Sequence, residues 1–211
     1  MGRSPQDPPD PAADYASFPA ATLAAGSEVV RAHGPRPPWW FSASGRFGLR
    51  PPRGTLYAAD DVATALRERH GVITLAAVVH PAIAAQTRVS YLRLGRDWRC
   101  ADIGHPDAAG FGVTRELAAA APVLDPGTGA ETYQAAPAWA EAFDRSGAAG
   151  IRYGARFSPG PDNAWALFGA AGDSERPAPA VRTITGETAF RLIGVTVSSR
   201  HSSATLTFAT P

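Results

Sequence analysis

The sequence predicts an α+β domain, on three observations. Short segments of β-branched or alternating apolar residues recur along the chain, and only a few helical segments separate them. Strands and helices do not alternate regularly, as they do in a doubly wound parallel fold. Of the 211 residues, 45% are apolar, which suffices for one proper hydrophobic core. We therefore expect a single domain over residues 14–211.

The N-terminal segment and the cysteine content bear on the compartment. Residues 1–13 are polar and rich in proline, so they cannot bury enough apolar surface to order themselves and are expected to form a disordered extension. They lack the apolar core of a signal peptide, and no stretch approaches the roughly 18 apolar residues of a membrane span. Cys100 is the only cysteine, so nothing requires an oxidising compartment. We expect a soluble, cytoplasmic protein.

The charge balance and the missing motifs exclude several classes of protein. The 20 basic residues are all arginine and face 19 acidic residues, for a net charge of +1. Binding to nucleic acid or to a membrane surface requires a basic excess, so neither is expected. Without lysine, the chain has no phosphate-loop lysine and no Schiff base. It also lacks GxGxxG, GxSxG and HExxH, which disfavours dinucleotide-fold dehydrogenases, serine hydrolases and metalloproteases, and no metal is predicted.

The first predicted elements come before residue 45. Residues 18–26 are expected to form a short helix or turn that ends at a glycine. Residues 28–33 (EVVRAH) are expected to form a strand, which a proline cluster then stops. Three adjacent aromatic residues follow at 39–41. They cannot all face one core, so either at least one of them lines a cleft or a surface contact, or they pin a loop to the core.

Residues 45–71 combine a basic loop, an apolar strand and a helix, and we predict the functional site there. The loop contains three arginines, Arg46 among them, and arginine is the preferred residue for two-point contacts to phosphate. A buried strand is predicted at residues 55–58, and it carries Tyr57. Anion binding, ring stacking and carboxylate chemistry can therefore meet in one segment.

The helix of this segment carries Glu68. Asp60 or Asp61 can accept the free amides at its start, and the apolar residues of its first turns share one face. At about 100° per residue, Glu68 lies roughly 110° from the middle of that face. A side chain at this position, beside the apolar face of the helix, can point into a cleft, and it can equally be a solvated glutamate.

The remainder of the chain is predicted to contain short strands and two helices. The apolar run at residues 72–79 is best interpreted as a central strand, and Tyr133 is expected to pack in the core from a helix at 132–146. The other expected elements are strands at 88–94, 98–103, 151–153 and 164–168, a helix from Thr114 to before Pro122, a Pro-rich linker at 174–180, and an antiparallel edge hairpin of 190–197 with 204–208.

Several short motifs, taken in their order along the chain, resemble the RES domain family. They are Gly26 with VRAH at 30–33, GRF at 45–47, LYA at 56–58, TALRE at 64–68, GIRY at 150–153 and ALF at 166–168. The resemblance spans roughly residues 18–170. It implies a mixed fold like that of ADP-ribosyltransferases, with short twisted sheets and flanking helices.

The resemblance also implies an activity and partners. RES domains commonly act as toxins that degrade NAD by hydrolysis or phosphorolysis, or that transfer ADP-ribose to a protein. A neighbouring antitoxin usually neutralises them. For this chain the resemblance implies NAD as substrate, NAD or ADP-ribose as ligand and an antitoxin as protein partner, and it leaves a homodimer open.

The family takes its name from an arginine, a glutamate and a serine. By resemblance, Arg31 is the arginine, Glu68 is the glutamate, and the serine position, two residues after Tyr153, holds Ala155. A missing hydrogen bond to a charged cofactor group costs about 1.5–3 kcal/mol, which weakens binding roughly ten- to a hundredfold. Ser158, in the same loop, is a candidate substitute.

Cleavage of the nicotinamide–ribose bond passes through a transition state that resembles a ribosyl cation. It requires arginines to hold the pyrophosphate, an aromatic face for the leaving ring and a carboxylate against the developing positive charge. By resemblance, Arg31 and Arg46 would hold phosphate, Tyr57 would stack on nicotinamide, and Glu68 would be the catalytic carboxylate.

Each candidate residue also has a purely structural interpretation. Arg31 could extend from a strand edge to solvent, Arg46 could be a solvated loop residue, and Tyr57 and Tyr153 could be core residues rather than pocket walls. His33 shares a strand face with Arg31, so it either contacts the nucleotide or lies at the surface.

Two functions of different classes therefore remain open. The first is an enzyme that consumes NAD. The second, motivated by Ala155, is a catalytically degenerate module on the same fold that binds a nucleotide or a protein partner. A third, a nucleic-acid-binding arginine protein, is disfavoured by the near-neutral charge.

Overall fold

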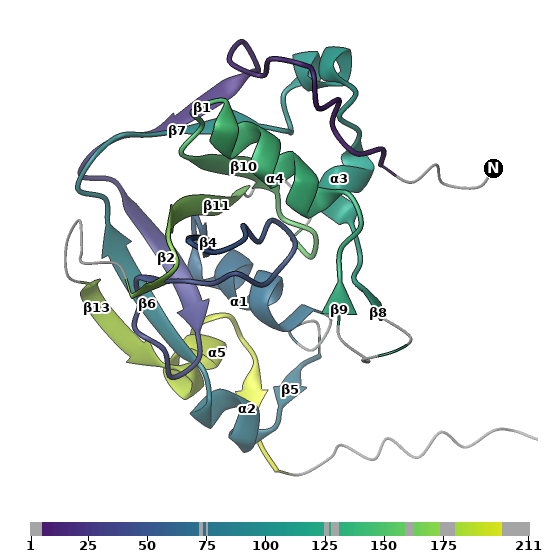
Figure 1. Ribbon diagram of the computed structural model, residues 1–211. Coiled ribbons are helices and arrows are strands. Elements are labelled where there is room, and N and C mark those ends of the chain that lie inside the picture. The colour runs from purple at the N-terminus through teal and green to yellow at the C-terminus, as the bar shows by residue number, and fades with distance from the viewer. Residues whose placement is uncertain are drawn as a thin grey trace, which may run out of the picture.

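A mixed eight-stranded sheet forms the centre of the fold in a computed structural model of the chain (Figure 1). The structure describes residues 6–71, 74, 76–124, 127, 131–158, 163–173 and 180–199. The strand order is β1-β7-β10-β11-β4-β2-β6-β13, and neighbours are antiparallel except for β7 with β10. The strands are β1 (Ala20–Leu23), β2 (Glu28–His33), β4 (Arg53–Ala59), β6 (Arg88–Arg93), β7 (Trp98–Asp102), β10 (Gly150–Gly154), β11 (Asn163–Ala170) and β13 (Ala180–Thr185).

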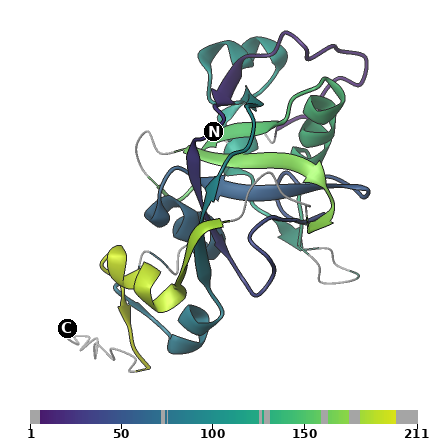
Figure 2. The ribbon, with the colours of Figure 1, turned by 90° about the vertical axis from the view of Figure 1, so that its left-hand side faces the viewer.

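Helices cover the sheet in two groups, which lie toward opposite ends of the molecule in both ribbon views (Figures 1 and 2). The helix α4 contacts β10, whereas α2 and α5 contact each other beside β6 and β13, and α1 contacts β2, β4 and β11. The helices are α1 (Val62–His70), α2 (Pro81–Ala85), the 3₁₀ helix η2 (Pro106–Phe111), α3 (Arg115–Ala119), α4 (Ala136–Arg145) and α5 (Gly186–Leu192).

Three short strand pairs complete the described structure. They are β3 (Trp40–Phe41) with β12 (Gly172–Asp173), β5 (Val78–Val79) with β14 (Thr196–Val197), and β8 (Val123–Leu124) with β9 (Glu131–Thr132). Within the described part of the chain, no helix combines the length and the apolar character needed to cross a membrane.

Apolar side chains point alternately to the two faces of the sheet along the strands, and both faces are packed. On β11, Ala166 and Phe168 pack with α4, whereas Trp165 and Leu167 contribute to a separate apolar cluster. This is the two-residue period of a strand buried on both faces. A third cluster joins α1, α2 and α5 to the β2 and β6 side of the sheet, with Leu66 of α1 fully buried in it.

The sheet is weakest between β2 and β4. Only one residue pair, Val30 with Ala59, joins these two described strands. By contrast, β4 pairs with β11 over seven residue pairs and β2 pairs with β6 over six. Beyond Val30 the two strands therefore diverge, which leaves a gap between Arg31 and Ala32 of β2 and Tyr57 and Ala58 of β4.

Many predicted elements are confirmed. The strand at residues 28–33 is β2, and those at 55–58, 88–94, 98–103, 151–153 and 164–168 correspond to β4, β6, β7, β10 and β11. Asp61 caps α1 by accepting from Thr64 N, and Thr114 caps α3. The α+β fold class predicted from the sequence is the one observed.

Two elements near the chain ends differ from the prediction. Residues 18–26 contain the strand β1, because pairing with β7 outweighs the local preference of a short Ala-rich segment. The predicted strand at 190–197 begins in the helix α5, which ends at Leu192 and whose cap Thr185 accepts from Thr188 N, and only Thr196–Val197 form a strand, β14. A short apolar run does not distinguish a strand from a buried helix. The predicted partner strand at 204–208 lies outside the described residues.

Two further predictions fail in the middle of the chain. The expected central strand at 72–79 is reduced to β5, which pairs only with β14, and residues 72, 73 and 75 lie outside the described range. The helix expected from residue 132 begins at Ala136, so Tyr133 precedes it. Pro137 is tolerated because it lies in the first turn of a helix that begins at Ala136. It would lie beyond the first turn of a helix that began at residue 132.

Part of the segment predicted as an extension contacts the domain. Thr114 N donates to Gln6 Oε1 at 2.8 Å, and Trp139 Nε1 donates to the main-chain oxygen of Asp7 at 2.8 Å. Of the predicted linker at 174–180, residues 174–179 lie outside the described residues. The division of the chain at residue 14 stays a prediction.

His70 ties the end of α1 to the third apolar cluster. Its Nε2 lies 3.0 Å from Thr87 Oγ1, and its ring centroid lies 5.6 Å from that of Phe190. Burial, and then the positive charge of Arg69, lower the His70 pKa from 6.5 to about 4. Between these two values the unfolded chain binds a proton at His70 that the folded chain does not bind.

The free energy of unfolding should therefore fall as the pH is lowered from about 6.5 toward about 4. Denaturant titrations across this range measure the effect. His70→Gln should remove part of the pH dependence, and His105→Gln, which changes an exposed histidine, should retain it. An unchanged pH dependence in His70→Gln would contradict the role of this side chain.

Candidate active site

A pocket of about 320 Å³ opens where β2 and β4 diverge. Its volume lies within the range of small-molecule sites. The residues that line it come from β2, the loop before β4, β4 itself, α1, the segment before α4, and β10. They are Arg31, Ala32, Ser42, Ser44, Gly45, Arg46, Tyr57, Ala58, Ala65, Glu68, Arg69, Tyr133 and Tyr153.

Glu68 is directed into this pocket from α1, and its side chain is only 12% exposed. The main-chain amide of Arg156 donates to Glu68 Oε1 at 2.7 Å, and Tyr153 lines the same pocket. Burial and the negative charge of Glu68 raise the pKa of Tyr153, so its hydroxyl keeps its proton. The carboxylate is thus held in one orientation.

Arg46 lies beside Glu68, with its Nη1 atom 3.9 Å from Glu68 Oε2. The residue is 9% exposed, and its guanidinium lies over the ring of Tyr153 at 5.5 Å from the centroid. Its Nε and Nη1 atoms are buried and have no hydrogen-bond partner among the described residues. Buried donors without an acceptor are costly, so these two nitrogens are available to an acceptor in addition to the nearby Glu68 carboxylate.

Arg31 enters the pocket from β2 and is also 9% exposed. Its Nη1 donates to the main-chain oxygen of Pro38 at 2.8 Å. Burial, and then the positive charge of Arg69, lower its pKa to about 10. Among the described residues, no carboxylate forms an ion pair with Arg31 or Arg69.

Arg69 was not predicted from the sequence, although this residue directly follows Glu68 on α1. Its guanidinium lies against Gly34, where a Cβ atom would come within 3.2 Å of Arg69 Nη2. The pocket therefore has three arginines, on β2, on the loop before β4 and on α1. Ser42, Ser44 and Tyr133 were also missed, because short loops carry no periodic signal that would direct them to a cleft.

Tyr57 forms a wall of the pocket at the end of β4. Its hydroxyl accepts from the Phe47 amide at 2.8 Å, and burial raises its pKa. Gly45 packs directly on its ring: a Cβ atom at this position would lie 2.7 Å from Tyr57 Oη, and the φ angle of +108° is one that other residues rarely adopt. The GRF motif thus supports Tyr57 as well as supplying an arginine.

Two of the predicted site residues lie outside the pocket. His33 is 3% exposed, and its Nε2 lies 2.8 Å from Ser90 Oγ, so it belongs to a buried polar network between β2 and β6. Ser158 is 6% exposed and lies against α1, where its hydroxyl contacts Thr64 and Arg67. Ala155 is buried in the main apolar cluster, which is the one that contains Ala166, Phe168 and the buried side chains of α4.

The aromatic residues at 39–41 also lie away from the pocket. Trp39 and Phe41 are buried in an apolar cluster, and Arg36 lies over the ring of Trp40 at 4.3 Å from the centroid. Trp39 and Phe41 therefore pin this loop to the core, and Trp40 is half-buried beneath Arg36.

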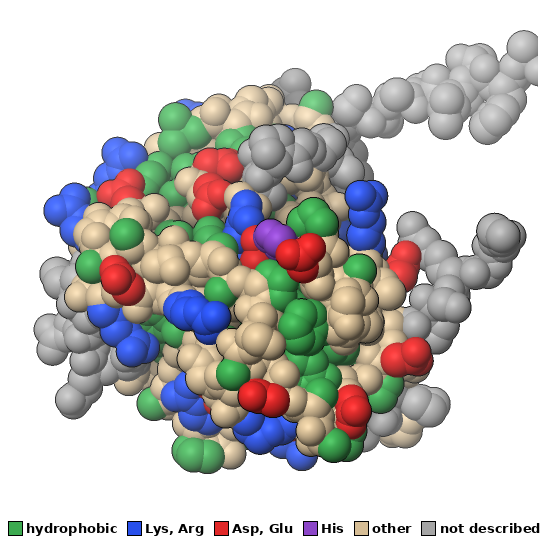
Figure 3. Space-filling model, turned by 90° about the horizontal axis from the view of Figure 1, so that it is seen from above, with side chains coloured by type: hydrophobic (Ala, Val, Ile, Leu, Met, Phe, Trp, Pro, Cys, Tyr) green, Lys and Arg blue, Asp and Glu red, His purple; other side chains and the backbone are tan. Residues whose placement is uncertain are grey.

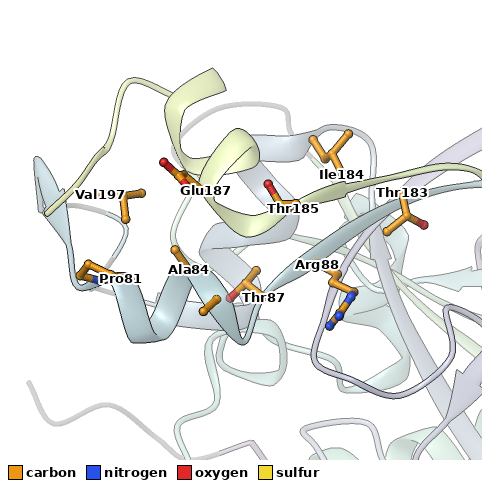
Figure 4. Close-up of a pocket in the computed structure, with 10 residues that line it drawn as sticks. Pro81, Ala84, Thr87, Arg88, Thr183, Ile184, Thr185, Glu187 and Val197 are labelled. Atoms are coloured by element: carbon orange, nitrogen blue, oxygen red, sulfur yellow. The ribbon is translucent and has the colours of Figure 1, made fainter.

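A second pocket, of about 540 Å³, lies between α2, α5 and the end of β13 (Figure 4). Three threonines, Arg88 and Glu187 are its polar side chains. Glu187 is paired with Arg191 at 2.7 Å, and no aromatic residue lines the pocket. Unlike the pocket at β2 and β4, it therefore has neither an oriented carboxylate beside a buried arginine nor an aromatic ring on which a ligand could stack.

Two other kinds of site find no support in the described residues. Within that part of the chain, no group of three or more His, Cys, Asp or Glu side chains could hold a metal ion. On the face seen in Figure 3, acidic and basic side chains are interspersed among apolar ones, without the single-sign area that nucleic acid would require.

Comparisons with known proteins agree with the resemblance found in the sequence. A search of solved structures matched the crystal structure of the M. tuberculosis MbcT–MbcA toxin–antitoxin complex, with a TM-score of 0.56 and 14% sequence identity over 81% of this chain and 91% of that chain. At this identity the match shows the fold alone. A search of curated proteins found no match.

A family comparison gives the more specific result. The model of the RES domain matches residues 28–189, which is most of the chain. The matched range includes every residue that lines the pocket at β2 and β4. The chain therefore belongs to the RES domain family.

Proposed function

We propose that this protein is an enzyme that cleaves the nicotinamide–ribose bond of NAD, with water, phosphate or a protein side chain as acceptor. The observation that carries the proposal is the presence, in one pocket, of an oriented carboxylate and a buried arginine two of whose nitrogens have no hydrogen-bond partner among the described residues. The carboxylate suits a developing positive charge, and the arginine suits a phosphate.

The charges of the pocket fit a dinucleotide. Its lining has three arginines and one glutamate, which leaves a surplus of two positive charges. A pyrophosphate group carries two negative charges, so it would neutralise this surplus. In this arrangement Arg31, Arg46 and Arg69 would hold the pyrophosphate, while Tyr57 would stack on the nicotinamide ring.

The chemical step then depends on Glu68. As nicotinamide leaves with the bonding electron pair, positive charge develops on the ribose, and a carboxylate held in one orientation stabilises it without reorganisation. The Arg156 amide supplies that orientation. Nicotinamide becomes neutral on leaving, so the oxidised cofactor is the substrate and the reduced one is not.

The test is release of nicotinamide from NAD by the purified protein, measured by chromatography. Parallel reactions with and without inorganic phosphate distinguish hydrolysis from phosphorolysis, and reduced NAD serves as the unreactive control. A folded protein that releases no nicotinamide at high enzyme concentration would refute the proposal.

We further propose that the protein is the toxin of a toxin–antitoxin pair, on the strength of its structural likeness to the MbcT–MbcA toxin–antitoxin complex. Induced expression should deplete cellular NAD and arrest growth, and Glu68→Gln should relieve both effects. Growth arrest without NAD depletion would separate toxicity from this chemistry.

One observation favours a second candidate, a binding module without catalysis. Ala155 stands at the position where the family has a serine, and its side chain is buried in the apolar core, so no hydroxyl is available there. This candidate predicts ADP-ribose binding by calorimetry with no product from NAD.

Replacing Arg31 should separate stability from binding. Arg31→Met removes a charge that is 9% exposed and has no carboxylate partner among the described residues, so we expect the free energy of unfolding to rise by about 1 kcal/mol. ADP-ribose binding should weaken roughly ten- to a hundredfold. Denaturant titration and calorimetry measure the two effects. Arg99→Met, at an exposed position of β7, should change neither, and a destabilised Arg31→Met would contradict the expectation.

A further inference from the structure

A tight turn at residues 155–158 supplies the amide that holds Glu68. Ser158 N donates to Ala155 O at 3.4 Å and closes the turn, which leaves Arg156 and Phe157 as its central residues. In such a turn the amide of the second residue takes no part in the closing bond, so it can donate elsewhere. Here it donates to Glu68 Oε1 at 2.7 Å.

Ser158 fastens this turn to α1. Its hydroxyl accepts from Arg67 Nη1 at 3.3 Å and donates to Thr64 Oγ1 at 3.3 Å. Thr64 in turn donates to Asp61 Oδ2 at 2.7 Å. The result is a chain of hydrogen bonds from Arg67 through Ser158 and Thr64 to Asp61, the residue that caps the helix. A hydroxyl has one proton to donate, and each of the two hydroxyls donates it to the next member.

The rest of the turn is held by packing. The ring of Phe157 lies over Gly71 at the end of α1, where a Cβ atom would come within 3.3 Å of Phe157 Cζ. Ala155, at the other end of the turn, is 8% exposed and belongs to the main apolar cluster. The polar attachment to α1 is therefore concentrated at Ser158 and at the Arg156 amide.

We propose that Ser158 is a positioning residue for Glu68, an inference that rests on the proposed function. The Ser158 hydroxyl locks the turn against α1, and the locked turn presents the Arg156 amide to the carboxylate. Removing the hydroxyl leaves Arg67 Nη1 and Thr64 Oγ1 without this partner, in a region where Arg67 Nε already has none. The turn then moves away from the helix, and Glu68 loses its fixed orientation.

This arrangement gives the loop serine a role different from that of a cofactor ligand. Ser158 does not line the pocket, so it does not replace a hydroxyl at position 155 by direct contact. Its effect reaches the pocket through the main chain of Arg156. Loss of orientation should therefore lower kcat, which depends on the carboxylate, and should leave ligand binding largely unchanged.

The experiment compares Ser158→Ala with Ser158→Thr, which keeps the hydroxyl, and with Ser146→Ala at the end of α4 as the control. Steady-state kinetics with NAD give kcat and KM, and amide hydrogen exchange followed by NMR in the ligand-free protein reports on the Arg156 amide. Ser158→Ala should lower kcat about tenfold, change KM by less than about twofold and speed Arg156 exchange. Ser158→Thr should recover both properties, and Ser146→Ala should match the wild type.

Wild-type exchange of the Arg156 amide in Ser158→Ala, or a rise in KM with kcat unchanged, would overturn the inference. Should Ser158→Ala fail to fold, Arg67→Met removes the donor to Ser158 and must show the same faster exchange. If the wild type does not cleave NAD at all, the proposed function fails, and the exchange measurement alone still decides whether Ser158 positions the amide that holds Glu68.

Discussion

Glu68→Gln should reduce nicotinamide release about a thousandfold while leaving the fold intact, because an amide of the same shape replaces the carboxylate. The neutral side chain can still accept from the Arg156 amide, but it carries no negative charge against the developing cation. A thousandfold loss corresponds to about 4 kcal/mol of transition-state stabilisation.

The same variant should retain ADP-ribose binding or strengthen it. Glu68 is the one acidic residue among those that line the pocket, and its removal raises the positive surplus from two charges to three. Calorimetry with ADP-ribose and a turnover assay with NAD therefore give opposite changes. Glu141→Gln, which breaks a peripheral ion pair with Arg50, is the matched control and should change neither quantity. Retention of a tenth of the activity in Glu68→Gln would contradict the catalytic role.

Gly45→Ala should reduce kcat/KM about a hundredfold, because a misplacement of about 1 Å in a stacking surface is enough for such a loss. The added Cβ would lie 2.7 Å from Tyr57 Oη and 2.9 Å from Tyr57 Cε2, so the ring must move. Moving it also withdraws the acceptor of the Phe47 amide. The backbone at φ +108° adds strain, and together these effects should lower the free energy of unfolding by about 2–3 kcal/mol.

Gly112→Ala is the control that introduces backbone strain without a steric contact. Gly112 has a φ angle of +82°, and a Cβ atom there would meet nothing within 4 Å. This variant should therefore lose only about 1 kcal/mol of stability and keep its activity. Equal loss of activity in the two variants would show that the contact with Tyr57 is not the cause.

The parts of the fold that local patterns specify were predicted well. Each of these signals occupies only a few residues of the sequence. They are the β-branched residues of β2, the proline cluster after it and the aspartate that caps α1. The flank position of Glu68 on α1 also follows from helical geometry alone. These signals are local, so a single sequence is enough to find them.

The rest depends on contacts between distant segments. Nothing near Ser158 in the sequence indicates Thr64 or Arg67 as its neighbours, since these residues lie 94 and 91 positions away. His33 shares a strand face with Arg31, yet Ser90 of β6 holds its ring inside the sheet. The divergence of β2 and β4, which creates the pocket, is a property of two pairings that neither strand reveals by itself.

The gap between β2 and β4 has a consequence for how a ligand is recognised. Thr55 N donates to Ser42 O, and Ser42 N donates to Thr55 O, so the main-chain groups of Thr55 point away from β11. In a strand, groups two residues apart point the same way, which directs the N–H and C=O of Tyr57 into the gap. Backbone N–H and C=O groups that point away from a neighbouring strand normally lie along the outermost strands of a sheet. Here such groups lie inside the sheet. The peptide backbone at position 57 thus offers a donor and an acceptor that persist whatever side chain evolution places there.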